Sequence, residues 1–152
     1  MNANPVASIV SNDADNIICA GTSVTFTGAP TAANYNFRVN GVSVQNGALS
    51  TYSTSALVNG NTVDVIVTNA SGCTGTSGVI TMTVNANPLA GLTSSDGDNI
   101  ICAGESVTFT GSGGTNYEFF VDGTSVQNGA VATYVTTGLL SGQVVTVRVS
   151  NA

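Results

Sequence analysis

Apolar residues alternate with threonine and serine along most of the chain, which is the period-two pattern of half-buried β-strands. Glycine and Asn-Gly pairs interrupt this alternation at short intervals, and the helical spacing of apolar residues is nearly absent. In the first half of the chain the pattern predicts strands at residues 6–10, 23–27, 34–39, 42–44, 50–57, 62–69 and 78–84. We therefore predict an all-β protein, and this number of short strands favours an immunoglobulin-like sandwich.

The same alternation predicts the buried faces and two tight turns. Val39-Asn40-Gly41-Val42 and Val121-Asp122-Gly123-Thr124 contain the residue pairs that supply the two positive φ angles of a type I′ turn. The residues predicted to point inward are Val24, Phe26, Tyr35, Phe37, Val39, Val63, Val65 and Val67 in the first half, and Val107, Phe109, Tyr117, Phe119, Val121, Val145, Val147 and Val149 in the second.

The chain is an internal repeat. Asp15–Gly21 returns 83 residues later as Asp98–Gly104 with every residue unchanged, and Asn2–Pro5 returns as Asn85–Pro88. A period of this length corresponds to one small domain. The predicted domains are residues 1–84 and residues 85–152.

The second copy is shorter than the first. Ser150-Asn151-Ala152 matches Thr68-Asn69-Ala70, and nothing in the second copy corresponds to Ser71–Val84, which contains a predicted final strand. We expect the chain to be a piece of a longer protein whose second sandwich lacks its last strand here. The alternative is a complete protein in which another molecule supplies a strand to the open edge.

Composition excludes several functions. Only 7% of residues are charged, there is no Lys or His, and the net charge is -6, so nucleic acid is a poor partner. No apolar stretch approaches the ~20 residues that span a bilayer, so no membrane insertion is expected. The sequence has no His or Lys that could act as a catalytic base. Glu105 and Glu118 have no second acidic residue at a matching spacing, so we do not expect an enzyme. The abundance of Thr, Ser, Asn and Gly is more usual outside the cell.

Half of the acidic residues lie in two equivalent loops. These residues are Asp13, Asp15, Asp96 and Asp98. Carboxylates near carbonyl oxygens and a domain junction suggest a Ca²⁺ ion that stiffens the chain. Asp is also a common turn residue, and no EF-hand spacing accompanies these acids. A calcium site and a plain turn both remain hypotheses, and no other cofactor is expected.

Cys19 precedes the second predicted strand, and Cys73 lies in the loop before the last one. In an extracellular sandwich these two could meet, and a disulfide closing a loop of that length would stabilise the fold by roughly 4 kcal/mol. Free buried thiols are the alternative, while zinc is disfavoured without His or a CxxC motif. Cys102 is the repeat of Cys19, but the chain ends before its partner.

Repeated aromatic residues lie mostly at inward positions, which fits a core better than a sugar-binding platform. Phe120 is the exception, because alternation places it outward where the first unit has Arg38. It could contact a neighbour, a sugar or nothing.

Ile-Cys-Ala-Gly-x-Ser-Val-Thr-Phe-Thr at residues 18–27 and 101–110, with Asn-Tyr-x-Phe and Val-Gln-Asn-Gly-Ala, resembles the tandem PKD-like or Ig-like repeats of very large Bacteroidota surface proteins. Some of those proteins are gliding-motility adhesins exported by the type IX system. The resemblance covers almost the whole chain and implies a secreted, surface-anchored stalk or filament. It also implies that Cys19 pairs with the cysteine of a Gly-Cys-Thr element, here Gly72-Cys73-Thr74.

The sequence thus favours a structural repeat of a cell-surface adhesin or filament that gives semi-rigid reach and multivalent display. Its expected partners are neighbouring repeats of the same chain or a homopolymer, with surface glycans as a further class. Two rivals stay open. One is a self-assembling filament subunit completed by strand donation between chains, and the other is a carbohydrate-binding accessory domain of a secreted enzyme.

Overall fold

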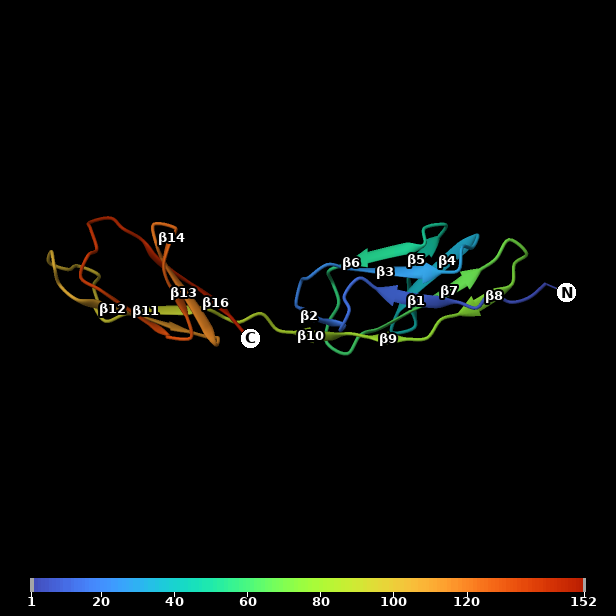
Figure 1. Ribbon diagram of the computed structural model, residues 1–152, viewed down its shortest axis with the longest axis horizontal. Helices are drawn as coiled ribbons and strands as arrows, with labels where there is room; N and C mark the ends of the chain where they lie inside the picture. The colour runs from blue at the N-terminus through green and yellow to red at the C-terminus, as the bar shows by residue number, and fades with distance from the viewer. Residues whose placement is uncertain (1, 152) are drawn as a thin grey trace. The chain divides into compact units, whose positions relative to one another are not determined.

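The computed structural model describes residues 2–151, and contacts within the chain divide it into two compact units (Figure 1). Unit 1 comprises residues 1–86 and unit 2 comprises residues 87–152. All regular structure in the described residues is β-strand, which confirms the predicted all-β class. Among residues 2–151, no helix has the length and apolar character needed to cross a membrane.

Unit 1 consists of two facing antiparallel sheets and a short parallel pair of strands. One sheet has the order β1-β3-β6, with β1 (Ser8–Ser11), β3 (Val24–Ala29) and β6 (Thr51–Thr54). The other has the order β5-β4-β7-β8, and β9 also pairs with β7. Its strands are β4 (Asn34–Val39), β5 (Val42–Gly47), β7 (Thr62–Thr68), β8 (Thr74–Thr76) and β9 (Ile80–Thr81). The parallel pair joins β2 (Ile17–Cys19) to β10 (Thr83–Asn85).

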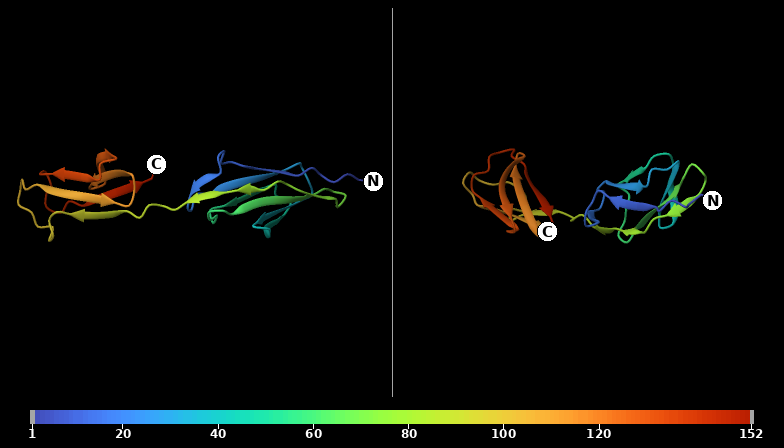
Figure 2. Two further views of the ribbon diagram at one scale, coloured as in Figure 1. Left: turned by 90° about the horizontal axis from the view of Figure 1, so that it is seen from below. Right: turned by 45° about the vertical axis from the view of Figure 1, so that its right-hand side comes forward.

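Unit 2 repeats the centre of this architecture, and Figure 2 shows two layers of strands in each unit. One sheet has the order β11-β12-β15, with β11 (Gly91–Ser94), β12 (Val107–Ser112) and β15 (Thr133–Thr136). The other has the order β14-β13-β16, with β13 (Asn116–Val121), β14 (Thr124–Gly129) and β16 (Val145–Ser150). The described part of unit 2 contains no counterpart of β8, β9 or β10.

Each unit has its own apolar core between its sheets. In unit 1 the predicted inward residues are buried except for Val39, which is half-buried. In unit 2 Val107, Phe109, Tyr117, Phe119 and Val149 are buried, whereas Val121, Val145 and Val147 are half-buried. Alternation therefore predicted the core faces correctly, and unit 2 covers part of its core less completely.

Both predicted turns are confirmed by their backbone angles. Asn40 and Gly41 have φ of 51° and 77°, and Asp122 and Gly123 have φ of 49° and 78°. These turns join β4 to β5 and β13 to β14, whose strands pair in antiparallel register.

The strand prediction differs from the structure at the ends of unit 1. Val6, predicted in the first strand, is 89% exposed and precedes β1. The predicted last strand is divided between β9 and β10, with Met82 between them. β2 and β8 were not predicted, because each is three residues long and lacks a clear alternation.

Candidate functional site

The acidic residues that could bind Ca²⁺ lie in the loops after β1 and β11, where their carboxylates accept hydrogen bonds from their own backbone. Asp15 Oδ1 accepts the Ile17 N–H at 3.0 Å. Its counterpart in unit 2, Asp98, accepts the Ile100 N–H at the same distance. These are Asx turns, which hold the chain where Asn16 and Asn99 each adopt a φ of 58°.

These hydrogen bonds change the acidity of two of the carboxyls. The pKa of Asp15 is lowered, chiefly because its carboxylate accepts the backbone N–H of Ile17. The pKa of Asp96 is also lowered, first by a hydrogen bond with the Asp98 side chain and then by the Asn99 backbone N–H. Both carboxylates are therefore used in holding the loop.

No group of three or more His, Cys, Asp or Glu side chains able to hold a metal occurs among residues 2–151. The Asn16 Oδ1 atom in the unit 1 loop is shielded from solvent without a hydrogen-bond partner. Calcium binding at Asp13 and Asp15, or at Asp96 and Asp98, stays a prediction, and the geometry favours the turn.

The three cysteines are free thiols in the structure, so the pairing of Cys19 with Cys73 inside one unit is not formed there and stays a prediction. Cys19 lies in β2, next to β10, whereas Cys73 lies in the turn between β7 and β8. Figure 1 draws these two places at opposite ends of unit 1, with β2 and β10 at one end and β8 beside the N-terminus at the other. A bond between the two sulfurs of one unit would have to cross the sandwich.

The turn that carries Cys73 packs against the N-terminal segment. Asn69 donates a hydrogen bond from Nδ2 to the Ala3 carbonyl at 3.1 Å, and its Oδ1 accepts the Cys73 N–H at 2.9 Å. The Cys73 thiol donates to the Asn2 carbonyl at 3.7 Å. A Cβ added to Gly75 would lie 1.9 Å from the Pro5 carbonyl oxygen, so only glycine permits this approach.

In unit 1 the segment from β9 to β10 closes one side of the core. Met82, between the two strands, is fully buried. Its N–H donates to the Asn61 carbonyl and its carbonyl accepts the Gly60 N–H, both at 2.9 Å. The core side chains of this region are buried as well, and they are Ile18, Phe26, Leu57 and Val63.

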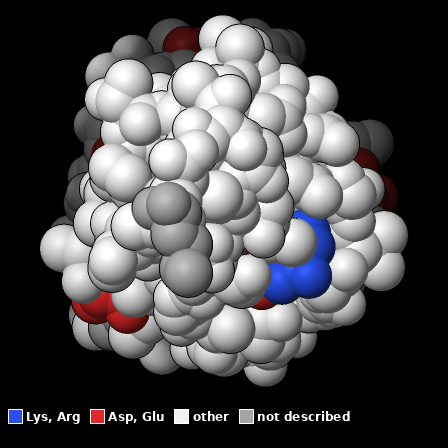
Figure 3. Space-filling model, turned by 90° about the vertical axis from the view of Figure 1, so that its right-hand side faces the viewer, with Lys and Arg blue, Asp and Glu red and all other residues white. Residues whose placement is uncertain are grey.

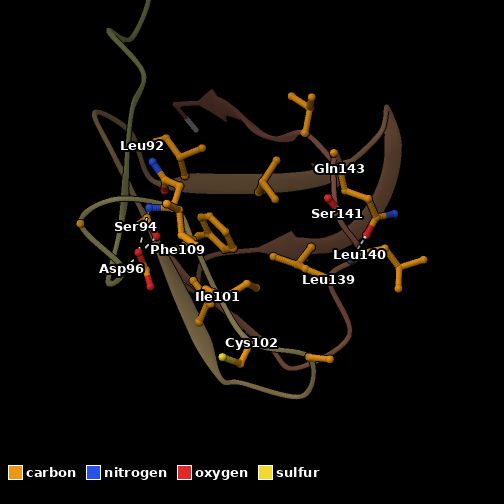
Figure 4. Close-up of a pocket in the computed structure, with 18 of the residues that line it drawn as sticks. Leu92, Ser94, Asp96, Ile101, Cys102, Phe109, Leu139, Leu140, Ser141 and Gln143 are labelled. Atoms are coloured by element: carbon orange, nitrogen blue, oxygen red, sulfur yellow. Dashed lines mark hydrogen bonds between the residues drawn. The ribbon is translucent and has the colours of Figure 1, made fainter.

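In unit 2 the same region is an open groove of about 990 Å³ (Figure 4). Figure 4 shows Leu92, Ile101, Phe109 and Leu139 pointing into it from different elements. Ile101 and Leu139 are half-buried, although their unit 1 counterparts are buried. At the rim, Gln143 accepts the Leu140 N–H at 2.9 Å. The groove is an unfilled part of an apolar core, and the charged side chain that lines it, Asp96, accepts the backbone N–H groups of Asp98 and Asn99.

Phe120, the candidate sugar-binding residue, is half-buried and lies under a charged side chain. The Arg148 guanidinium is 5.9 Å from the centre of the Phe120 ring and also forms an ion pair with Glu118. This cation–π contact occupies the ring face that a sugar would need. Arg148 therefore has a specific contact, which sequence reasoning missed.

The described surface is poor in charge. Figure 3 shows one face on which a single basic patch and a few acidic atoms interrupt an otherwise uncharged surface. In unit 1, Arg38 Nε donates to Asp64 Oδ1 at 2.8 Å, so this cation is also paired.

No protein-family model matches the chain, and no curated protein matches it either. Among solved structures, the fibronectin(III)-like modules of Clostridium thermocellum CbhA match 93% of this chain and 84% of their own, at 14% identity and a TM-score of 0.50. This match and the strand order decide the fold. Each unit is an immunoglobulin-like or fibronectin-III-like β-sandwich.

Two further matches have lower TM-scores and longer chains. A central fibronectin-III array of RIM-binding protein has 14% identity and a TM-score of 0.39, and 60% of it is covered. A bacterial ice-binding adhesin of 1.5 MDa has 18% identity and a TM-score of 0.40, and 55% of it is covered. The chain thus spans little more than half the length of these two structures.

Proposed function

We propose that this chain is a structural repeat module of a large extracellular surface protein, in which serial β-sandwiches provide reach and repeated display. This proposal includes the finer expectation of a stalk or adhesin of the kind found in Bacteroidota, exported by the type IX system and used in gliding motility. It rests on the resemblance of the sequence motifs and on one structural observation.

That observation is that the polar residues retained in both units have the same structural task in each. Asn34 donates to Asn46, and Asn116 donates to Asn128. The Tyr35 hydroxyl donates to the Pro30 carbonyl, and the Tyr117 hydroxyl donates to the Gly114 carbonyl. The Gln45 and Gln127 side chains donate to the carbonyls of Thr51 and Thr133. At one further equivalent position, Asn40 accepts the N–H of Thr62 and Asp122 accepts the N–H of Val144.

Repetition of these residues therefore preserves folding and not a reaction centre. A protein that needs only one active site gains nothing from two copies of its turns and core, whereas a stalk gains length with each copy. The covered Phe120 ring and the internally bonded acidic loops also favour this reading over a carbohydrate-binding accessory domain.

Small-angle X-ray scattering of the chain in solution tests the proposal. A stalk module should give the long maximum dimension and asymmetric distance distribution of two sandwiches joined by a short linker. A compact particle in which the two units fold back on each other would contradict the stalk.

A second candidate is favoured by the groove of unit 2, where an extended strand from another chain would fill the place that β9 and β10 take in unit 1. In this function the chain is a filament subunit that is completed by strand donation. The groove has the matching apolar wall, since Phe109 and Val107 are the repeats of Phe26 and Val24.

A peptide with the sequence of residues 71–85 tests this candidate. It should bind the chain and raise the melting temperature of unit 2, while a control peptide with Asp in place of Ile80 and Met82 should not. Equal effects of the two peptides would exclude a strand-specific groove. Concentration-dependent assembly of the chain alone is the second expected result.

A further inference from the structure

The two contacts that place Cys19 and Cys73 involve the same residue of the repeat. Asn2 begins the Asn2–Pro5 segment, and Asn85 begins its copy, Asn85–Pro88. Unit 1 includes both, because Asn2 lies at its start and Asn85 ends β10. In a serial array, the residue that is Asn85 for one repeat is therefore Asn2 for the next.

At the end of unit 1, Asn85 lies beside the strand of Cys19. β2 and β10 pair in parallel with Cys19 opposite Asn85. The Asn85 carbonyl accepts the N–H of Ala20, the residue after Cys19, at 2.8 Å. Cys19 is exposed here, so its thiol is accessible at this end of the sandwich.

At the start of unit 1, the carbonyl of the equivalent residue is occupied by the other cysteine. The Cys73 thiol donates to the Asn2 carbonyl at 3.7 Å. The turn is held in this place by Asn69, which bonds both Ala3 and Cys73, and by the close approach of Gly75 to Pro5. Cys73 is therefore placed against the N-terminal segment by several independent contacts.

The contact beside Cys19 and the contact of Cys73 therefore involve the same backbone carbonyl, because Asn85 of one repeat is Asn2 of the next. In its role as Asn85 this carbonyl accepts the Ala20 N–H at 2.8 Å, and in its role as Asn2 it accepts the Cys73 thiol at 3.7 Å. Cys19 is adjacent to Ala20 in the chain, so both cysteine positions lie beside the same backbone carbonyl of the repeat.

We propose that Cys19 of one repeat forms a disulfide with the cysteine at the Cys73 position of the following repeat, so that a covalent bond clamps each junction. The inference rests on the proposed function as a serial repeat. It differs from the predicted pairing inside one unit, and it accounts for the position of the two thiols at opposite ends of unit 1.

The bond forms by oxidation of two thiols. Each thiol loses its proton, the two sulfurs join, and the two electrons reduce a low-molecular-weight disulfide such as oxidised glutathione to two thiols. An oxidising extracellular compartment supplies this class of oxidant. By the same rule, Cys73 would pair with the cysteine at the Cys19 position of a preceding repeat, and Cys19 would pair with the cysteine of a Gly-Cys-Thr element in the following repeat.

Disulfide mapping of an extended chain tests the proposal. A copy of residues 71–85 is appended after Ala152, which gives unit 2 its own Gly-Cys-Thr element and a fourth cysteine. After oxidation with oxidised glutathione, peptide mass mapping should find Cys19 joined to the appended cysteine, with Cys73 and Cys102 still free. A bond from Cys19 to Cys73, or from Cys102 to the appended cysteine, would overturn the proposal.

Two single variants and the unextended chain serve as controls. Cys19→Ser should abolish the bond in the extended chain, whereas Cys102→Ser should leave it intact. The unextended chain, oxidised in the same way, should form no bond between Cys19 and Cys73. Circular dichroism of each variant verifies that it is folded. If a folded extended chain keeps four free thiols while its scattering remains that of a long particle, the clamp is wrong and the stalk function stands.

Discussion

Met82 has no counterpart among the described residues of unit 2, and its environment explains much of the difference between the two cores. It is fully buried, and its backbone bonds on both sides to the loop at residues 60–61. Where this side chain is present, Val63 is fully buried, and where it is absent, the equivalent Val145 is half-buried. The segment that carries Met82 thus covers one edge of the unit 1 core.

Met82→Ala should lower the free energy of unfolding of unit 1 by about 2–5 kcal/mol, because it removes a fully buried side chain and leaves a cavity. Urea denaturation followed by circular dichroism measures this loss. Val79→Ala is the matched control, since Val79 is 59% exposed and its loss should cost less than about 0.5 kcal/mol. Equal costs for the two variants would contradict the role of Met82 in the core.

The acidic loops should make the stability depend on pH. Asp15 and Asp96 have a lower pKa in the folded chain than the ordinary 3.8, so their contribution is present above that value and is lost as the pH falls through the folded pKa. The melting temperature should therefore fall as the pH drops below 3.8. Asp15→Asn should make this fall less steep, and an unchanged slope would contradict the assignment.

Calcium gives a separate prediction for the same loops. Because Asp15 and Asp98 already accept backbone N–H groups, we expect the loops to keep their conformation without an ion. Removal of calcium with EDTA should leave the melting temperature unchanged within about 1 °C, and Asp13→Asn should behave in the same way. A drop of several degrees that added Ca²⁺ reverses would establish the calcium site and contradict this expectation.

At the scale of elements, the turn between β4 and β5 requires glycine at one position. Gly41 has a φ of 77°, which side-chain-bearing residues adopt only with strain. Gly41→Ala should cost about 1 kcal/mol in the free energy of unfolding. Gly47→Ala, at a site with open space and no positive φ in the left-handed region, is the control that should cost much less. Chemical denaturation of both variants provides the comparison.

The longer strands and the hairpins were predictable because their signals are local. β4 begins and ends at the predicted residues. The turns at Asn40-Gly41 and Asp122-Gly123 can be predicted from their residue types alone. β2 was not predictable in this way, since its partner β10 is more than sixty residues away along the chain and the pairing is parallel. A strand defined by a distant partner has no pattern of its own.

β8 was not predicted either, although its sequence contains a signal that could have indicated it. Its sequence is Thr-Gly-Thr, and glycine inside a strand often marks a close backbone approach, which here is the approach of Gly75 to Pro5. For the candidate site, sequence reasoning singled out Cys19 and Cys73. It could not place them, because their positions depend on which end of the sandwich each loop occupies.

At the scale of the whole molecule, the central claim is that each unit folds around its own core and that repetition serves mechanical reach. The two cores share no residue, since one contains only unit 1 side chains and the other only unit 2 side chains. The described part of unit 2 has no counterpart of β8, β9 or β10, so unit 2 should be the weaker of the two under load.

Single-molecule force spectroscopy of the chain, held at its two ends, tests this claim most directly. The account predicts two separate unfolding steps in each trace, each lengthening the chain by on the order of 200 Å, with unit 2 unfolding at the lower force. A single cooperative step that releases the whole chain at once would contradict it.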